Sequence, residues 1–179
     1  MIRYRSAAHD WWRDLVPRAG YPGDRAALAK LRRASTISEA MTEEASIALF
    51  RRVGATSAED LPRVALAAAV LARVSKDPDG PNAPRSVARV LGPQKADDVS
   101  TAILSPLRFK RLLAADEPEE QLIAFRRMVA IARGSLPVRD LADALLDWSE
   151  TRRRRWVFDY WNASEIASTP TTDAPEEPV

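Results

Sequence analysis

Arginine is the residue type in this sequence with the most evident chemistry. Only four residues are lysine, so arginine supplies 23 of the 27 basic side chains. A guanidinium presents a planar fork of donors that suits phosphate oxygens and the faces of nucleobases. Codon bias in a GC-rich genome is the alternative cause of this excess, so the composition favours an anionic partner without establishing one.

The segment 24–34 predicts a helix with one basic face. At 100° per residue its leucines share one side, whereas Arg32 and Arg33 flank the other. Asp24 at the expected cap is the only acid of the segment, although a solvated face usually mixes both signs. This face suits a polyanion, unless acids elsewhere in the fold neutralise it.

The segment 107–113 repeats this pattern. Phe109, Leu112 and Leu113 converge on one side, Lys110 and Arg111 point elsewhere, and no acid occurs before Asp116. We therefore expect a second basic face here.

Arg126 and Arg127 follow two acids on the next segment. Viewed down a helix axis they lie beside Glu119 and Glu120, so we interpret them as members of ordinary surface pairs.

The run Arg152–Arg155 is the densest positive charge in the chain. If a single helix covers 138–161, Arg152 falls within its apolar stripe and Arg155 at the edge of that stripe. The stems of these two arginines are therefore expected to be partly buried.

The other two arginines of the run differ in their local partners. Arg154 has Glu150 at i−4 and can pair with it, whereas Arg153 has Ser149 there. Arg153 is therefore the best phosphate-binding candidate of the run. The alternative is a solvated helix end whose cations interact favourably with the helix dipole.

Residues for the common catalytic chemistries are scarce. Without cysteine there is no thiolate nucleophile or disulfide, and His9 alone cannot build a histidine metal site. Carboxylate pairs such as Asp143 and Asp147 lack a histidine partner, and no glycine-rich phosphate loop, serine elbow or HExxH motif is present. We expect a protein that is not an enzyme and needs no metal or cofactor.

The five tryptophans allow two interpretations. They could stack nucleobases, as in proteins that bind single strands. Their helical spacing with leucines favours core packing.

Helical periodicity runs through the chain and predicts an all-α protein. Asp24 is an expected N-cap, Gly54 an expected C-terminal stop, and Ser57 with Asp60 a capping box. The expected helices cover about 4–16, 25–34, 38–53, 57–75, 86–91, 107–114, the stretch from the acids at 116–120 to about 133, and 138–161.

Clustered prolines and glycines suggest a division into two small helical bundles. They predict a bundle at 1–78, a linker at 79–97 and a second bundle at 98–162. Residues 163–179 are rich in Ser, Thr, Pro and acid and are expected to be a disordered tail. The net charge is +2, but the last seven residues contain three acids and no base, so residues 1–172 carry +5.

Neither a membrane span nor a secretory signal is expected. The longest apolar run, Val64 to Ala72, is far shorter than the roughly 20 residues that a bilayer requires. The lack of cysteine agrees with a cytoplasmic location.

Together, these motifs resemble the CasB-type small subunit of the type I-E CRISPR surveillance complex, Cascade. The resemblance covers about residues 3–162. In chain order it rests on Trp11 and Trp12, the block Gly23 to Ala34, Ser105 to Leu113, Phe125-Arg126-Arg127, Leu145 to Trp148, the arginines that follow, Trp156 and Asp159-Tyr160-Trp161.

The resemblance implies an all-helical, non-catalytic subunit present in two copies in an RNA-guided complex that contains CRISPR RNA. Its partners would be the other Cascade subunits, a second copy of itself and single-stranded target-site DNA, whose displaced strand it would help to hold. The positions that resemble the family's basic sites are Arg33, Arg63, Arg108, Lys110, Arg111 and the run Arg152–Arg155. The acidic tail and residues 76–98 depart from the family pattern.

An adaptor that binds only proteins remains the rival interpretation. It would use the same amphipathic helices, and its arginine faces would be covered by other subunits rather than by nucleic acid. A hydrolase would need convergent carboxylates or histidines, which the sequence does not offer.

Overall fold

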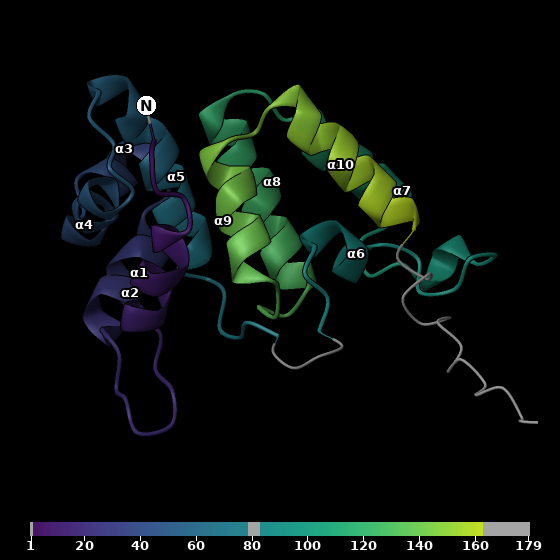
Figure 1. The fold of residues 1–179 in the computed structure, drawn as a ribbon, viewed down its shortest axis with the longest axis horizontal. Helices are drawn as coiled ribbons and strands as arrows, with labels where there is room; N and C mark the ends of the chain where they lie inside the picture. Colours follow the sequence, from purple (N-terminus) through teal and green to yellow (C-terminus); the bar gives the residue numbers. More distant parts are fainter. Residues whose placement is uncertain (1, 79–82, 163–179) are drawn as a thin grey trace, which may run out of the picture.

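The computed structural model describes residues 2–78 and 83–162 and confirms the all-α class (Figure 1). Within these ranges the chain forms helices joined by turns, and three isolated bridges are its only β-type pairing. In chain order the helices are α1 (Ala7–Leu15), α2 (Arg25–Arg33), α3 (Ile37–Met41), α4 (Glu44–Arg52), the 3-10 turn η1 (Ala58–Asp60), α5 (Leu61–Leu71), α6 (Val87–Leu91), the 3-10 turn η2 (Val99–Thr101), α7 (Pro106–Leu113), α8 (Pro118–Ile131), α9 (Val138–Leu146) and α10 (Glu150–Trp161).

Local signals fix several helix ends as expected. The Asp24 side chain accepts a hydrogen bond from the backbone N–H of Ala27 at 2.8 Å and caps α2. Ser57 and Asp60 form a reciprocal capping box ahead of α5. Gly54 follows α4 with a φ of +63°, the left-handed conformation that glycine adopts without a steric penalty.

Two expected helices are each broken into two. The segment 38–53 splits after α3, because the Thr42 hydroxyl bonds to the Glu39 carbonyl and Glu43 is extended. The segment 138–161 splits at 147–149, where Asp147 and Ser149 leave the helical conformation. The prediction of one continuous helix was therefore wrong in both places.

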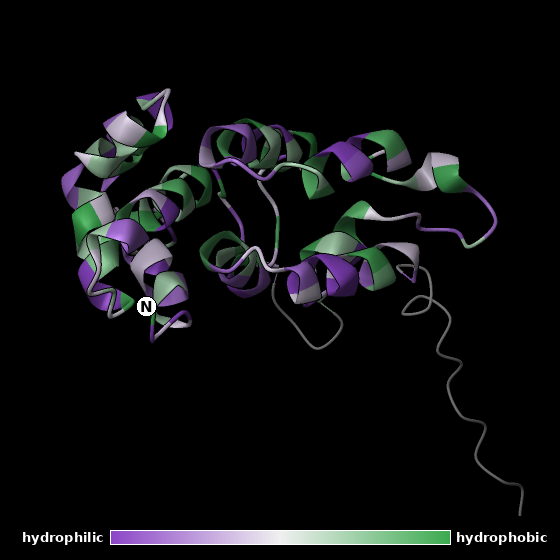
Figure 2. Cartoon of the chain, turned by 90° about the horizontal axis from the view of Figure 1, so that it is seen from above, coloured by the Kyte–Doolittle hydropathy of each residue, from purple (hydrophilic) through white to green (hydrophobic). Residues whose placement is uncertain are grey.

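Helix α5 is the most completely buried helix of the described chain. Its residues from Val64 to Leu71 are fully buried, and it packs against α3, α4, α8 and α9. The many alanines of this helix let its neighbours approach closely on all sides. Figure 2 shows most of the outer helices with one hydrophilic and one hydrophobic side, which is the pattern of surface helices around a shared core.

Aromatic side chains hold the C-terminal helices together. Phe125 of α8 meets Trp148 and Trp156 edge to face, with ring centroids 5.1 and 6.0 Å away. Trp11, Trp12, Trp148 and Trp156 are buried, which confirms the core interpretation for these four. Trp161 is the exception, because half of its surface is exposed.

Buried residues from Ala8 to Tyr160 form one hydrophobic cluster. Helices α1–α5 lie at one end of the molecule, α8 and α9 in the middle, and α6, α7 and α10 at the other end (Figure 1). The bundle boundaries at 78 and 98 stay a prediction. The expected disordered tail, residues 163–179, lies outside the described residues.

Candidate nucleic-acid interface

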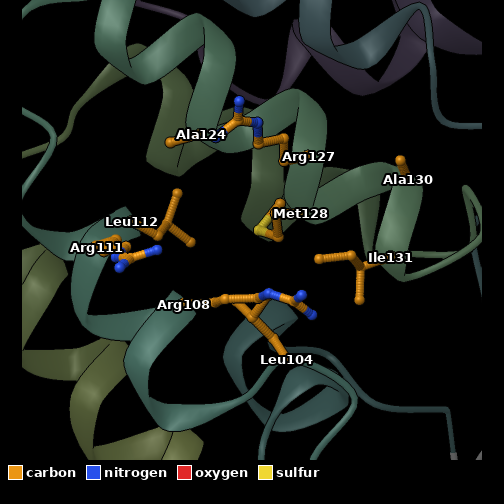
Figure 3. A pocket seen from close by; sticks show the side chains of 9 residues that line it. All are labelled: Leu104, Arg108, Arg111, Leu112, Ala124, Arg127, Met128, Ala130 and Ile131. Carbon is orange, nitrogen blue, oxygen red and sulfur yellow. The ribbon is translucent and has the colours of Figure 1, made fainter.

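A pocket of about 530 Å³ lies between α7 and α8 and brings three arginines together. Arg108 and Arg111 come from α7, and Arg127 comes from α8. Figure 3 shows Met128 between Arg127 on one side and Arg108 and Arg111 on the other. The pocket is therefore a cationic rim around an apolar interior.

The apolar interior follows from the packing of the two helices. Phe109 and Leu112 of α7 are buried, which turns Arg108 and Arg111 toward the open side of the helix. Leu112, Met128 and Ile131 line the pocket, and none of the described residues that line it is acidic. An anion that enters it meets guanidinium groups with no competing carboxylate.

The cations at this site are free to bind a partner. Across residues 2–78 and 83–162, no hydrogen bond or ion pair engages the side chains of Arg108, Lys110, Arg111 or Arg127. All four residues are exposed. Lys110 is on α7 but does not line the pocket. The structure thus brings two of the three predicted α7 cations together with a third arginine that was not predicted.

Arg127 was missed because the sequence was read for charge pairs. The expected ion pairs of Arg126 and Arg127 with Glu119 and Glu120 do not form among the described residues, so that prediction was wrong. The spacing of Arg127 could have found it. Arg127 lies three residues after Ala124 and four before Ile131, so the three residues share the side of α8 that lines the pocket.

A second group of arginines joins α2 to α8 and to the residues that follow α5. Arg126 donates to the Leu31 carbonyl at 3.2 Å, and Arg73 donates to the Arg32 carbonyl at 2.7 Å. Burial, followed by repulsion from Arg73, lowers the pKa of Arg126. Arg32 itself donates to the Ala72 carbonyl at 2.7 Å, so it is not a free cation.

Arg33 and Arg63 have different surroundings. Arg33 is exposed at the end of α2, with no side-chain partner among the described residues. Arg63 is half-buried and donates to the Gln121 side chain. Burial lowers the pKa of Arg63, and Asp147 counteracts this effect.

Each arginine of the run on α10 already has an acidic partner. Arg152 lies 3.7 Å from Asp140 and is mostly buried, as expected. Arg155 lies 3.8 Å from Asp159, but its side chain is 70% exposed, so the expectation of a buried stem was wrong. The predicted pair of Arg154 with Glu150 is confirmed at 3.3 Å.

Arg153 has a partner that its own helix does not reveal. Its guanidinium donates to Asp116 at 2.6 Å and lies 5.6 Å from the centre of the Trp148 ring. Sequence reasoning found no acid at i−4, but Asp116 is 37 residues away in the chain. A phosphate that binds Arg153 has to compete with this carboxylate.

The position of the run also excludes the helix-dipole interpretation. Helix α10 begins at Glu150, so Arg152 is its third residue and the run lies in its N-terminal half. Cations are favoured at the C-terminal end of a helix and disfavoured near its N-terminus. The dipole therefore does not account for this concentration of arginines.

Groups for metal binding or membrane insertion do not gather in the described part of the chain. No cluster of three or more histidine, aspartate or glutamate residues there could hold a metal ion. Among the described helices, none has the length and apolar character needed to cross a bilayer.

Comparison with known proteins supplies the family. A family described as CRISPR-associated protein Cse2 matches residues 27–161. A chain in the crystal structure of E. coli Cascade bound to a PAM-containing dsDNA target has the same fold, with a TM-score of 0.62 and 18% sequence identity over 92% of this chain and 98% of that chain. No curated protein matches the sequence. Since the family match spans well over half of the residues and includes both helices of the arginine pocket, the chain belongs to the Cse2 family of CRISPR-associated proteins.

Proposed function

We propose that this chain is a non-catalytic small subunit of an RNA-guided Cascade complex. In that complex its arginine surface binds the DNA backbone without sequence preference and stabilises the displaced strand of the R-loop. The partners in this proposal are the other Cascade subunits, a second copy of the chain, the CRISPR RNA-containing complex and single-stranded target-site DNA.

The arginine pocket is the observation that carries this proposal. Arg108, Arg111 and Arg127 line this pocket from two helices, and none of the described residues that line it is acidic. Arg33 and Lys110 add exposed cations outside the pocket. Separate guanidinium groups of this kind suit a chain of phosphates, since each can bind a different phosphate oxygen.

The chemistry of RNA-guided recognition fits such a surface. Base pairing with the guide reads the sequence, so a subunit that follows the backbone needs cations and no code for bases. Each bound phosphate releases counterions, and a few bound phosphates are enough for retention inside an assembly. The net charge of +2 for the whole chain is compatible with that modest role.

The comparisons support the assembly part of the proposal. The E. coli Cascade structure that contains the similar chain is bound to a double-stranded DNA target. The shared fold and the family relate this chain to a protein from such a complex.

A reconstituted complex with a triple substitution tests the proposal. Arg108→Gln, Arg111→Gln and Arg127→Gln remove the cationic rim and leave the buried faces of α7 and α8 unchanged. R-loop lifetime should fall for every target sequence. The salt dependence of retention should flatten by roughly 0.7 log units per log salt for each single-strand phosphate that the variant no longer binds.

The matched control removes the same charge elsewhere. Arg25→Gln, Arg51→Gln and Arg139→Gln change three exposed arginines on α2, α4 and α9. If both triple variants enter the complex normally and lose equal R-loop stability, net charge rather than the pocket is responsible. If neither changes R-loop lifetime, the DNA-binding proposal is wrong.

An adaptor role is the second candidate, and one surface feature favours it. Phe158 and Trp161 on α10 are 61% and 51% exposed, and Leu107 on α7 is 60% exposed. Apolar side chains of this size at one end of a molecule suit a protein partner. Substitution of Phe158 and Trp161 by Ser should impair incorporation into the complex if this surface binds another subunit, whereas the pocket variant should still be incorporated.

A further inference from the structure

The arginine pocket and the acidic end of the chain have complementary charge. Asp173, Glu176 and Glu177 lie close together in the sequence, with no base among residues 173–179. They lie beyond residues 27–161, which the Cse2 family matches, and beyond Asn162, where the described chain ends. The pocket offers three arginines, and no acid is among the described residues that line it.

We propose that the acidic segment 173–177 binds in the arginine pocket of its own chain and competes there with nucleic acid. The docking itself stands on the pocket and the sequence. The competition rests on the proposed function, because it assumes that DNA uses the same arginines.

The described chain ends next to the helix that carries two of these arginines. Tyr160 of α10 donates to the Leu104 carbonyl at 2.6 Å, and its ring stacks on Phe109 of α7 with a centroid distance of 4.0 Å. Leu104 also lines the pocket. The described chain therefore ends two residues after a side chain that contacts the pocket wall.

Ten residues separate Asn162 from the acidic segment. The eleven steps from Asn162 to Asp173 span at most about 36–40 Å when fully extended. A helix with its side chains is about 10–12 Å across. The segment can therefore reach the pocket on either side of α7.

The lining of the pocket suits an acidic peptide better than it suits a stacked nucleobase. Its interior includes Leu112, Met128 and Ile131, and none of the described residues that line it has an aromatic ring on which a base could stack. The segment 173–177 reads Asp-Ala-Pro-Glu-Glu, so two small apolar residues stand between its acids, and Pro178 and Val179 follow it. Apolar packing inside the pocket and ion pairs at its rim can then form together.

A tether makes weak interactions sufficient for this docking. A short flexible connection gives an effective concentration on the order of millimolar. Exposed ion pairs are individually weak and are screened by salt. A segment with an intrinsic Kd of about 1 mM would thus occupy the pocket roughly half to four fifths of the time at low salt. Its neutralisation should then raise the affinity for DNA by roughly two- to fivefold.

The docking is tested by NMR on the full-length protein. The chain has no cysteine, so Ala174→Cys provides a single site for a nitroxide label, which broadens the signals of nearby nuclei. The methyl group of Met128 in the pocket is the reporter, and Met41 on α3 is the internal reference. We expect stronger broadening at Met128 than at Met41, and recovery at high salt or in the Arg108→Gln/Arg127→Gln variant. Equal broadening at the two methionines, or broadening that survives both treatments, would overturn the docking.

The competition is tested with a fluorescein-labelled dT20 oligonucleotide at low salt. Asp173→Asn, Glu176→Gln and Glu177→Gln together should tighten its binding two- to fivefold, and Glu165→Gln, a neutralised acid outside the segment, should leave it unchanged. In the Arg108→Gln/Arg127→Gln background the tail substitutions should have no effect.

If the tail substitutions leave dT20 binding unchanged while the arginine substitutions weaken it, the competition is wrong and the proposed function stands. If Met128 broadens but the arginine substitutions leave dT20 binding unchanged, the proposed function fails and the docking stands.

Discussion

Asp159 joins α10 to α6 through side-chain hydrogen bonds, and Asp159→Ala tests how much these bonds contribute to the free energy of unfolding. Its buried carboxylate accepts a hydrogen bond from the Ser86 hydroxyl at 2.7 Å and one from Arg89 Nε at 3.3 Å. Arg155, one turn earlier on the same face of α10, lies 3.8 Å from this carboxylate. Asp159→Ala leaves the Ser86 hydroxyl and the Arg89 guanidinium without their acceptor.

The expected loss of stability follows from burial and from the two donors that lose their acceptor. Breaking a buried pair by removing one partner costs about 3–5 kcal/mol, and a hydrogen bond to a charged group about 1.5–3 kcal/mol. Arg89 is 22% exposed, so water compensates part of its loss. We expect Asp159→Ala to lower the free energy of unfolding by about 3 kcal/mol, or Tm by roughly 6–12 °C in a chain of this length.

Urea denaturation followed by circular dichroism measures this effect. Asp159→Asn should lose less, because its amide oxygen still accepts a hydrogen bond. Arg154→Ala is the control in the same helix and should cost no more than about 0.5 kcal/mol, because its pair with Glu150 is exposed. A double-mutant cycle with Ser86→Ala should give a coupling of about 1–3 kcal/mol. A loss for Asp159→Ala as small as that of Arg154→Ala would refute the reasoning.

Three further substitutions test other parts of the fold by denaturation. Trp156→Ala removes a fully buried indole and should cost about 3–5 kcal/mol; a loss below about 1 kcal/mol would mean that the core at this site collapses around the gap. Gly134→Ala places a side chain at a φ of +71°, with its Cβ 2.8 Å from the Ser75 hydroxyl, and should cost about 1–2 kcal/mol; unchanged stability would contradict the strain. Burial raises the pKa of Asp140 above 3.8, so the stability from this group is present below that value and is lost as pH rises through the folded-state pKa. The Asn side chain of Asp140→Asn can still accept a hydrogen bond from the Val87 N–H but does not ionise. The free energy of unfolding of this variant should therefore rise relative to that of the wild type as pH increases from 3.8 through the folded-state pKa of Asp140, and a difference that does not change with pH would contradict the raised pKa.

The fold class and most helix ends were predictable because they depend on local signals. Asp24, Gly54 and Ser57 mark their helix ends through interactions within a few residues. The break at 147–149 was not predictable in this way. Asp147 bonds to Arg5 at 2.8 Å, across 142 residues of sequence, and Trp148 stays buried through the break, so the apolar pattern continues.

The candidate site was predictable only on one helix at a time. The basic face of α7 was evident from its periodicity, and Arg108 and Arg111 do line the pocket. The contribution of Arg127 depends on the packing of α8 against α7, which no local pattern encodes. The partner of Arg153 was hidden for the same reason, since Asp116 precedes α8 and meets α10 only in the folded chain.

The complete burial of α5 has a consequence for hydrogen exchange. From Val64 to Leu71 this helix presents no surface to solvent, and its neighbours α3, α4, α8 and α9 come from both halves of the sequence. Helices at the periphery can fray or detach while the rest of the molecule stays intact. Helix α5 cannot detach alone, because each of its sides is covered by a different neighbour. Its amide protons should therefore exchange only when the whole fold opens, which makes them the slowest protons of the chain and a direct measure of its global stability.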